Sequence, residues 1–593
     1  MAHPVRKLPR QPIPSLADTL DAARRSVSPL LNGLQRIKSK LVFDLFGAAQ
    51  VKPQKRLLTL ARQRPINWCA AGLTHWWLSN RGGLPFSNNY VLMLEDDPRA
   101  ATLSERAARL IVGALNLNQS IRAQSLPPDV ADNLPLEMDQ YRRCFATHRR
   151  PQAQCDELVT VTGSHHIALL IDGHVHCMAV DLQHGALSLQ AVQQALDNVL
   201  ENIDITYEND MAPGMLSALP REQWMRQRGE LLKSHQNQQT LLLLEKALFV
   251  VCLDTGVMPG SLSGLSANLR DGNSHNRLYD KSMQIVVMEN GKAGLCFERA
   301  AVDGSVALGF AARLQRESLK LSAVGEGETG PGRGIRIRAA AWSMSLALKQ
   351  ELIAAKNAIA ERRSQRAIET WTALRLGGRR LQSFEIGADA VVQLAVQLAV
   401  YQVTGDTPAI FEPVQLRHFA GGRLDFIVPV TAESLTAVRA LSDPVAKYKA
   451  AKLMRLAAQE HHNLVLRTKN GRGLIAHLMT LNAIQVRDAV QHGTNTWHRA
   501  VLSRLDKGLQ ALFRQDVLAA NGSGFPGVAA FGPIGPRPDM VSIGYMITED
   551  GIVFDLRGDG RFAAQIRALR SALDKALAAI EEVLAASAQG RPR

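Results

Sequence analysis

The sequence predicts an α/β or α+β fold with two or more domains. The chain has 593 residues, whereas one domain usually holds about 100 to 200. The apolar runs 284–288 and 294–298 are joined by Asn290-Gly291, a hairpin signal in which both turn residues are expected to take positive φ. Residues 561–586 predict a helix, because apolar side chains recur there every three or four positions. Strands and helices mixed along one chain are typical of this class.

Two further elements have clear signals. A second hairpin is expected between 541–547 and 552–556, with its turn at Glu549-Asp550-Gly551. The apolar stretch 388–402 predicts a buried helix, and it is too short to cross a bilayer. No transmembrane segment is therefore expected.

The composition is that of a globular protein with an excess of positive charge. Hydrophobic residues make up 46% and charged residues 21% of the chain, which is ordinary for a folded domain. The net charge of +15 predicts an anionic partner, such as nucleic acid, anionic lipid, an acidic carrier protein or a polyphosphate like coenzyme A. Aromatic residues amount to only 5%, so nucleic acid is not the expected partner.

Cysteine usage and the N-terminus bear on the compartment. The six cysteines lack the spacing of metal ligands, which predicts reduced thiols in a cytoplasmic protein. No apolar signal core follows the basic N-terminus, so secretion is not expected.

Several motifs occur in order along the chain. The central one is GLCFERAAVDG at 294–304, and four others are PLEMDQYRRCFATHRRP at 135–151, GMLSALPREQW at 214–224, FEPVQLRHFAGGRLD at 411–425 and Phe531-Gly532-Pro533. Together they resemble the choline/carnitine O-acyltransferase family. The resemblance extends from about residue 10 to residue 560.

The resemblance implies a pair of similar α/β domains, each a mixed sheet flanked by helices, with an active-site tunnel between them. One domain is expected from residues 1–65 with 341–593, and the other from residues 66–340. The Gly-rich segment 324–334 is expected to be a connector just before the boundary. Acyl thioester would enter the tunnel from one side and the acceptor alcohol from the other.

The resemblance places the catalytic histidine of the family at Arg299. A guanidinium stays protonated at physiological pH, so it cannot accept a proton from an alcohol. Asp303 matches a carboxylate position of the same motif. Two interpretations remain open: Arg299 forms a buried ion pair with Asp303, or it binds a phosphate or carboxylate in the tunnel.

The hydroxyl donors of the family have also changed. The resemblance implies a Ser-Thr-Ser element for the oxyanion, and the corresponding stretch here contains Ala519 and Ala520. Asn521 and Ser523 are the remaining candidate donors. His477 is a candidate substitute base, although a structural role is the alternative interpretation.

The acceptor and CoA sites differ from the family pattern. Carnitine-using members hold the substrate carboxylate with a Tyr, a Thr and an Arg, and these positions are here Phe411, Leu424 and Ala476. A buried carboxylate without partners is costly, so carnitine is not expected. Candidates for the 3′-phosphate of CoA are Arg379 and Arg380, ahead of Asp389, unless they form an ordinary charged loop.

These observations leave two functions from different classes. The first is acyl transfer from CoA or a carrier protein to a non-carnitine acceptor, without the family's His base, using either an unrecognised base or an amine nucleophile that needs less base assistance. The second is an inactive ligand-binding or scaffold protein, and an unrelated reaction in the same cavity is a third possibility. We expect a monomer without covalent cofactor. We expect no metal, because the resemblance places the histidines and cysteine of 174–177 in a strand without one.

Overall fold

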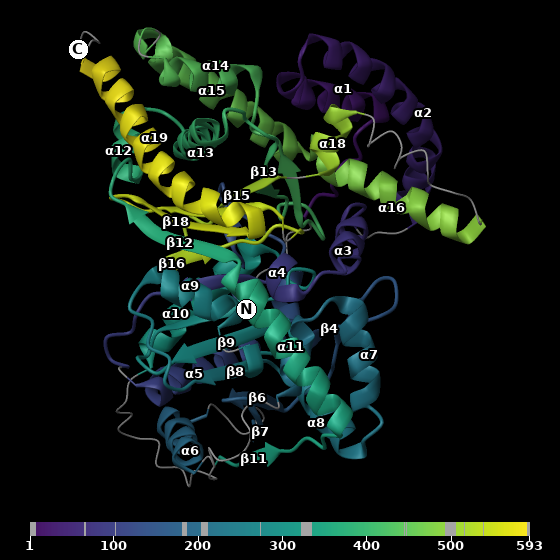
Figure 1. Cartoon of the computed structure of the whole chain (residues 1–593), viewed down its shortest axis with the longest axis vertical. Helices are drawn as coiled ribbons and strands as arrows, with labels where there is room; N and C mark the ends of the chain where they lie inside the picture. The colour runs from purple at the N-terminus through teal and green to yellow at the C-terminus, as the bar shows by residue number, and fades with distance from the viewer. Residues whose placement is uncertain are drawn as a thin grey trace.

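The structure is a computed structural model that describes residues 8–63, 67–100, 102–180, 187–202, 212–272, 274–321, 335–443, 445, 447–492, 506–514, 516–537 and 539–589. Two large mixed sheets flanked by helices lie one above the other along the long axis of the molecule (Figure 1). The α/β prediction is therefore confirmed. The segment 324–334 lies outside the described residues.

The first sheet has eight strands in the order β11-β7-β6-β8-β9-β10-β1-β16. Its middle pairs, β6–β8 and β8–β9, are parallel, and the other pairs are antiparallel. Strands β1, β8, β9 and β10 are buried along their whole length, as expected for strands covered on both faces. The strands are β1 Tyr90–Leu94, β6 His166–Ile171, β7 His174–Ala179, β8 Val250–Asp254, β9 Met283–Met288, β10 Ala293–Phe297, β11 Ile337–Ala340 and β16 Val528–Gly532.

The predicted hairpin at 284–298 is confirmed, but its turn differs from the expected one. Strands β9 and β10 are antiparallel, and Gly291 has a φ of 72°. Asn290 is not among the described residues with positive φ. The loop is therefore of the kind in which glycine alone takes the left-handed conformation.

The second sheet has six strands in the order β12-β18-β17-β15-β13-β14. Strands β13, β15 and β17 are parallel, and the remaining pairs are antiparallel. The predicted hairpin at 541–556 is confirmed as β17–β18. The strands are β12 Arg366–Ala373, β13 Ile410–Gln415, β14 Leu424–Ile427, β15 Val517–Asn521, β17 Val541–Ile547 and β18 Ile552–Asp559.

Helices cover both sheets. The predicted helices at 388–402 and 561–586 are confirmed as α13 (Ala388–Thr404) and α19 (Ala563–Gln589), which pack on each other beside the second sheet (Figure 1). The first sheet is covered by α5 (Leu103–Arg122), α9 (Leu262–Asp271) and α10 (Gly304–Lys320). Other helices are α3 Ala70–Leu78, α4 Leu84–Ser87, α6 Leu189–Glu201, α7 Arg221–Leu231, α8 His235–Lys246, α11 Leu346–Ser364, α12 Gly378–Ser383, α14 Ala432–Ser442 and α15 Lys447–Arg467.

Chain segments far apart in sequence meet in both halves. The N-terminal helices α1 (Leu16–Val27) and α2 (Gly33–Gln63) pack against α16 (Ile475–His492) and α18 (Lys507–Phe513). Strand β16 comes from the C-terminal part of the chain, yet it forms the edge of the first sheet beside β1. The division at residues 65/66 and 340/341, and the tunnel between the domains, stay predictions. No described helix is both long and apolar enough to cross a membrane.

Candidate functional site

Arg299 lies just after β10, at the junction of the two sheets. Its side chain is 7% exposed, and its guanidinium carbon Cζ lies 4.2 Å from the centroid of the Trp77 ring. Nη1 donates a hydrogen bond of 3.2 Å to the backbone carbonyl of Ile534. The Nε atom has no hydrogen-bond partner within the described residues. The guanidinium is thus fixed in place but retains an unused donor.

Arg299 keeps its positive charge although it is buried. Burial lowers the pKa of the guanidinium to about 10, while the nearby charge of Asp303 acts in the opposite direction. A group with a pKa of about 10 is still protonated at neutral pH. Arg299 therefore cannot act as a general base there, whereas a cation in a poorly solvated site is a strong electrostatic donor.

The carboxylate of Asp303 pairs with Arg423, and no ion pair with Arg299 forms. Arg423 Nη2 lies 2.8 Å from Oδ1 and Nε lies 3.0 Å from Oδ2, and Gln140 Nε2 donates to Oδ2 at 2.9 Å. Burial raises the pKa of Asp303, but the bidentate contact with Arg423 outweighs it, so the net pKa is lowered. The ion pair between Arg299 and Asp303 was one of the two interpretations left open, and it does not form; Arg423 and Gln140 bind the carboxylate instead.

Glu298, the residue before Arg299, is held from three sides. Arg149 Nη1 lies 3.0 Å from its Oε1, Asn88 Nδ2 donates to Oε1 at 2.7 Å, and the Ala301 amide donates to Oε2 at 2.9 Å. Arg149 also donates from Nε to Asp156 at 2.8 Å. These contacts fix the backbone that presents Arg299.

The ion-pair network around Asp156 was not predicted from the sequence. Its carboxylate pairs with Arg81, Arg149 and Arg221 at distances of 2.6 to 2.8 Å. Arg149 lies inside the motif at 135–151, so its place in that motif was the available signal. A sequence does not show, however, that an arginine is fully buried.

The two candidate oxyanion donors lie together but are already hydrogen-bonded. Asn521 Nδ2 donates to Asp389 Oδ1 at 2.8 Å, and Asn521 Oδ1 accepts from the Ser523 amide at 2.7 Å. Ser523 Oγ accepts from the Ile547 amide at 2.7 Å, and the Tyr545 hydroxyl donates to Asp389 at 2.6 Å. Asp389 thus holds the side chain of Asn521, at the end of β15, and that of Tyr545 by hydrogen bonds. These contacts leave open the hydroxyl hydrogen of Ser523 and the second Nδ2 hydrogen of Asn521.

The segment after Arg299 and the loop that carries Asn521 and Ser523 both approach the ring of Phe531. A Cβ atom added to Gly304, the first residue of α10, would lie 3.5 Å from the Phe531 ring, and one added to Gly522 would lie 2.9 Å from Phe531 Cβ. Ala519 and Ala520 are buried. The end of β15 and the segment after Arg299 are therefore neighbours across Phe531.

The three predicted acceptor residues are buried in apolar surroundings. Phe411 and Leu424 belong to one hydrophobic cluster, with the Phe411 and Phe426 ring centroids 6.5 Å apart. Ala476 belongs to another cluster, and its amide donates to Asp425 Oδ1 at 2.6 Å. Burial raises the pKa of Asp425 to about 6, against the effect of its backbone hydrogen bonds. No cation that could replace the arginine of the family stands at residue 476.

The two predicted CoA-clamp arginines already have acidic partners. Arg379 is exposed and pairs with Glu549 and with Asp550. Arg380 pairs with Glu581 at 3.2 Å. These contacts favour the interpretation as a charged loop, because a phosphate would have to displace carboxylates from both guanidinium groups.

The surroundings of His477 favour a structural role. Its Nδ1 lies 2.7 Å from the hydroxyl of Thr19, and its Nε2 lies 2.8 Å from Oε1 of Gln54. Burial lowers the pKa of His477 to about 4. Both nitrogens therefore bind the N-terminal helices, and the imidazole has no lone pair directed at a substrate.

One group of possible metal ligands is present in the part of the chain that the structure describes. Asp389, Glu412 and His461 place one ligand atom each within 4.8 Å of one another. His461 Nε2 lies 2.8 Å from Glu412 Oε2, and burial, followed by the Asp389 charge, raises the pKa of Glu412 to about 8. A proton shared by Glu412 and His461 accounts for this geometry without a metal. Residues 174–177, on β7, form no such group.

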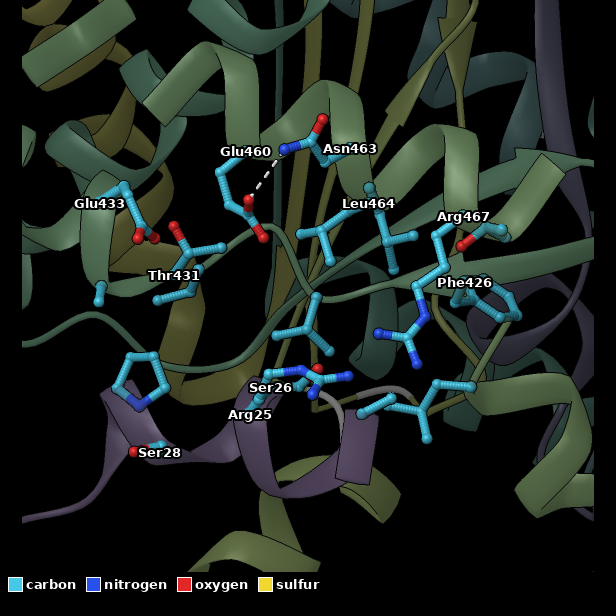
Figure 2. Close-up of a pocket in the computed structure, with 18 of the residues that line it drawn as sticks. Arg25, Ser26, Ser28, Phe426, Thr431, Glu433, Glu460, Asn463, Leu464 and Arg467 are labelled. Atoms are coloured by element: carbon cyan, nitrogen blue, oxygen red, sulfur yellow. Dashed lines mark hydrogen bonds between the residues drawn. The ribbon is translucent and has the colours of Figure 1, made fainter. Parts of the chain in front are cut away.

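A cavity of about 520 Å³ lies beside β14. Figure 2 shows Arg25 and Arg467 at one side of it and Glu433 with Thr431 at another. Burial lowers the pKa of Arg467, and the charges of Arg25 and Arg472 lower it further. The cavity therefore combines an apolar wall, which includes Phe426, with a cluster of cations that suits an anionic group.

Comparison with known proteins identifies the family of this chain. Residues 11–574 match the family described as Choline/Carnitine o-acyltransferase, and this chain belongs to that family.

Curated relatives match over most of their length. The chain is 26% identical to "Carnitine O-acetyltransferase" of Rattus norvegicus, over 82% of this chain and 80% of the relative. It is also 26% identical to "Carnitine O-palmitoyltransferase 2, mitochondrial" of Mus musculus, over 92% and 87%. Among solved structures, the first condensation domain of the CDA synthetase is similar, with 11% identity, coverage of 86% and 94%, and a TM-score of 0.40.

Proposed function

We propose that this protein transfers an acyl group from an acyl thioester, on CoA or on a carrier protein, to an acceptor other than carnitine. Membership of the family supports acyl transfer, because its similar relatives are carnitine acyltransferases by name. The observation that supports an acceptor other than carnitine, and a reaction without the family base, is the buried guanidinium of Arg299 at the position of that base. An amine acceptor fits best, since it needs less help in losing its proton than an alcohol does.

In this proposal Arg299 stabilises negative charge in place of removing a proton. Its Nε is an unused, charge-assisted donor, and the tetrahedral intermediate of acyl transfer carries a negative oxygen. Removing one such donor typically lowers the rate by roughly 10²–10³. The open hydroxyl hydrogen of Ser523 is a second candidate donor.

The ion pairs that Arg379 and Arg380 each form with acidic residues support an acyl donor that carries no 3′-phosphate. Both side chains are engaged by acidic groups, and a phosphopantetheine arm on a carrier protein lacks that phosphate. The proposal includes a cytoplasmic location, which fits the six free cysteines, and a monomer, which remains an expectation.

A second candidate is a ligand-binding protein without catalysis. The observation that favours it is the internal hydrogen bonding of Asn521 and Ser523, which gives both side chains a structural role. The cavity beside β14 would then hold the ligand.

The test is thiol release from acetyl-CoA in the presence of primary amines or alcohols, with acyl products identified by mass spectrometry. We expect acylated amine with the wild type and a loss of roughly 10²–10³ in rate for Arg299→Gln. Arg570→Gln, which removes an exposed arginine that pairs with Glu369 at 2.8 Å, is the matched control and should leave the acetyl transfer rate unchanged. Bound CoA without any acyl product would overturn the proposal in favour of the second candidate.

A further inference from the structure

A cysteine, a histidine and a serine lie together on the outer side of α3. His75 Nδ1 lies 3.5 Å from Cys155 Sγ. Ser79 Oγ lies 3.4 Å from His75 Nε2 and 3.6 Å from Cys155 Sγ. A thiol within hydrogen-bonding reach of an imidazole, which is in turn oriented by a third group, is the arrangement of an activated nucleophile.

The hydrogen bonds among these three side chains are complete when the pair is charged. In a thiolate–imidazolium state, Nδ1–H donates to the sulfur, Nε2–H donates to the serine oxygen, and the serine O–H donates to the sulfur. Each donor hydrogen is then used once. His75 also lies in the last turn of α3, where the helix dipole favours a cation.

The titration behaviour of the pair agrees with this geometry. Burial raises the pKa of the Cys155 thiol, but the hydrogen bonds with His75 and then Ser79 outweigh it, so the net pKa is lowered. The hydrogen bond with Cys155 raises the pKa of His75 against the effect of burial. Each partner thus favours the charged form of the other.

The loop that carries Cys155 is anchored firmly to α3. The Asp156 amide donates to the Leu78 carbonyl at 3.1 Å, and Arg149 Nη2 donates to the same carbonyl at 3.2 Å. The three arginines around Asp156 hold its side chain as well. The distance between the sulfur and the imidazole is therefore set by a rigid frame.

The pair is separate from the Arg299 site and reachable from solvent. His75 is exposed and Cys155 is partly exposed, whereas Trp77 is 1% exposed. Residues two positions apart on a helix point to nearly opposite sides. His75 therefore faces away from Arg299, which stacks on Trp77.

We propose that Cys155 and His75 form a nucleophilic pair that accepts an acyl group from a thioester. His75 takes the thiol proton, Cys155 Sγ bonds to the thioester carbonyl carbon, and the bond from that carbon to the donor sulfur breaks. The donor leaves as a thiol with the proton returned by His75, so no oxidant or other reactant is needed. The choice of a thioester as substrate rests on the proposed function.

The experiment uses the full chain and a small thioester, S-acetyl-N-acetylcysteamine, which needs no CoA site. We expect an acetyl group at Cys155 that hydroxylamine removes, found by peptide mass spectrometry. The acetyl group should be absent in Cys155→Ser and greatly slowed in His75→Asn. Cys177 is the matched control, because it is also partly exposed but burial raises its pKa.

A second measurement follows the rate of alkylation by iodoacetamide from pH 6 to 9. Cys155 should react about tenfold faster than Cys177 at pH 7, and His75→Asn should remove this advantage. Equal rates at the two cysteines, or fast alkylation without acetylation, would overturn the inference. Because neither probe uses the CoA site, this failure is distinct from a failure to transfer acyl groups from acetyl-CoA.

Discussion

Arg299 and Trp77 form a cation–π pair, with the guanidinium carbon 4.2 Å from the ring centroid. Such a pair holds a cation by its face and leaves the edge available for hydrogen bonds. The edge of Arg299 uses Nη1 on Ile534 and leaves Nε unpaired. The position that holds the base in the family thus presents a fixed positive charge in this member.

Replacing Arg299 by Met should leave the fold intact and raise its stability. A buried charge without a directly bonded carboxylate is costly, and an apolar side chain of similar volume is commonly neutral or stabilising by about 1–2 kcal/mol. Urea unfolding followed by circular dichroism measures the change. A decrease of about 2 kcal/mol or more in the free energy of unfolding would show that Arg299 has a structural role, and would contradict the proposal that it serves the reaction.

Arg423→Met should be strongly destabilising. It would leave the buried carboxylate of Asp303 without its bidentate partner, and breaking one side of a buried ion pair costs about 3–5 kcal/mol. The double variant Arg423→Met/Asp303→Leu should recover most of this loss, because neither charge of this ion pair remains. The free energy of unfolding in urea is the readout, and equal stabilities of the single variant and wild type would contradict the pairing.

Acid should destabilise the wild type more than His477→Gln. The pKa of His477 is about 4 in the folded protein and about 6.5 in an unfolded chain. The unfolded chain therefore binds the proton first, so the stability present above pH 6.5 is lost as the pH falls through 4. The difference between the two pKa values corresponds to a loss of roughly 3 kcal/mol in the free energy of unfolding across this pH window.

The measurement for His477 is urea unfolding at pH 7, 5.5 and 4 for both proteins. The free energies of unfolding should converge as the pH falls, because glutamine cannot take up a proton. Parallel pH profiles for the two proteins would show that His477 titrates normally.

CoA and 3′-dephospho-CoA should bind with similar affinity. The 3′-phosphate has to compete with Glu549, Asp550 and Glu581 for the two candidate arginines. We expect calorimetric affinities within about fivefold of each other, since exposed charge contacts contribute little. A preference for CoA of about thirtyfold or more that is lost in Arg379→Ala/Arg380→Ala would show that these two arginines bind the 3′-phosphate.

Local elements were predictable, because their signals lie within a few residues. The Gly291 hairpin, the hairpin at 541–556 and the helices α13 and α19 all follow from turn residues and apolar spacing. The partner of Asp303 was not predictable in this way, since Arg423 lies 120 positions away. Asp303 and Arg423 both lie in motifs of the sequence, at 294–304 and 411–425, but only the fold decides whether Arg299 or Arg423 reaches the carboxylate.

The same limit applies to other contacts between distant parts of the chain. Cys155 and His75 are 80 positions apart, and nothing in their local sequence indicates that they meet. The pairing of Arg379 with Glu549 and Asp550 depends on the hairpin between β17 and β18 lying beside α12. The addition of β16 to the first sheet was likewise not predicted.

The most direct test of the account is carnitine-dependent thiol release from acetyl-CoA by wild type and Arg299→His. We predict no carnitine turnover in either protein, because Phe411, Leu424 and Ala476 still offer no partner for the carnitine carboxylate. Folding of Arg299→His is checked by its unfolding curve. Robust carnitine acetylation by the folded variant would contradict the account, since it would mean that position 299 alone separates this protein from carnitine acyltransfer.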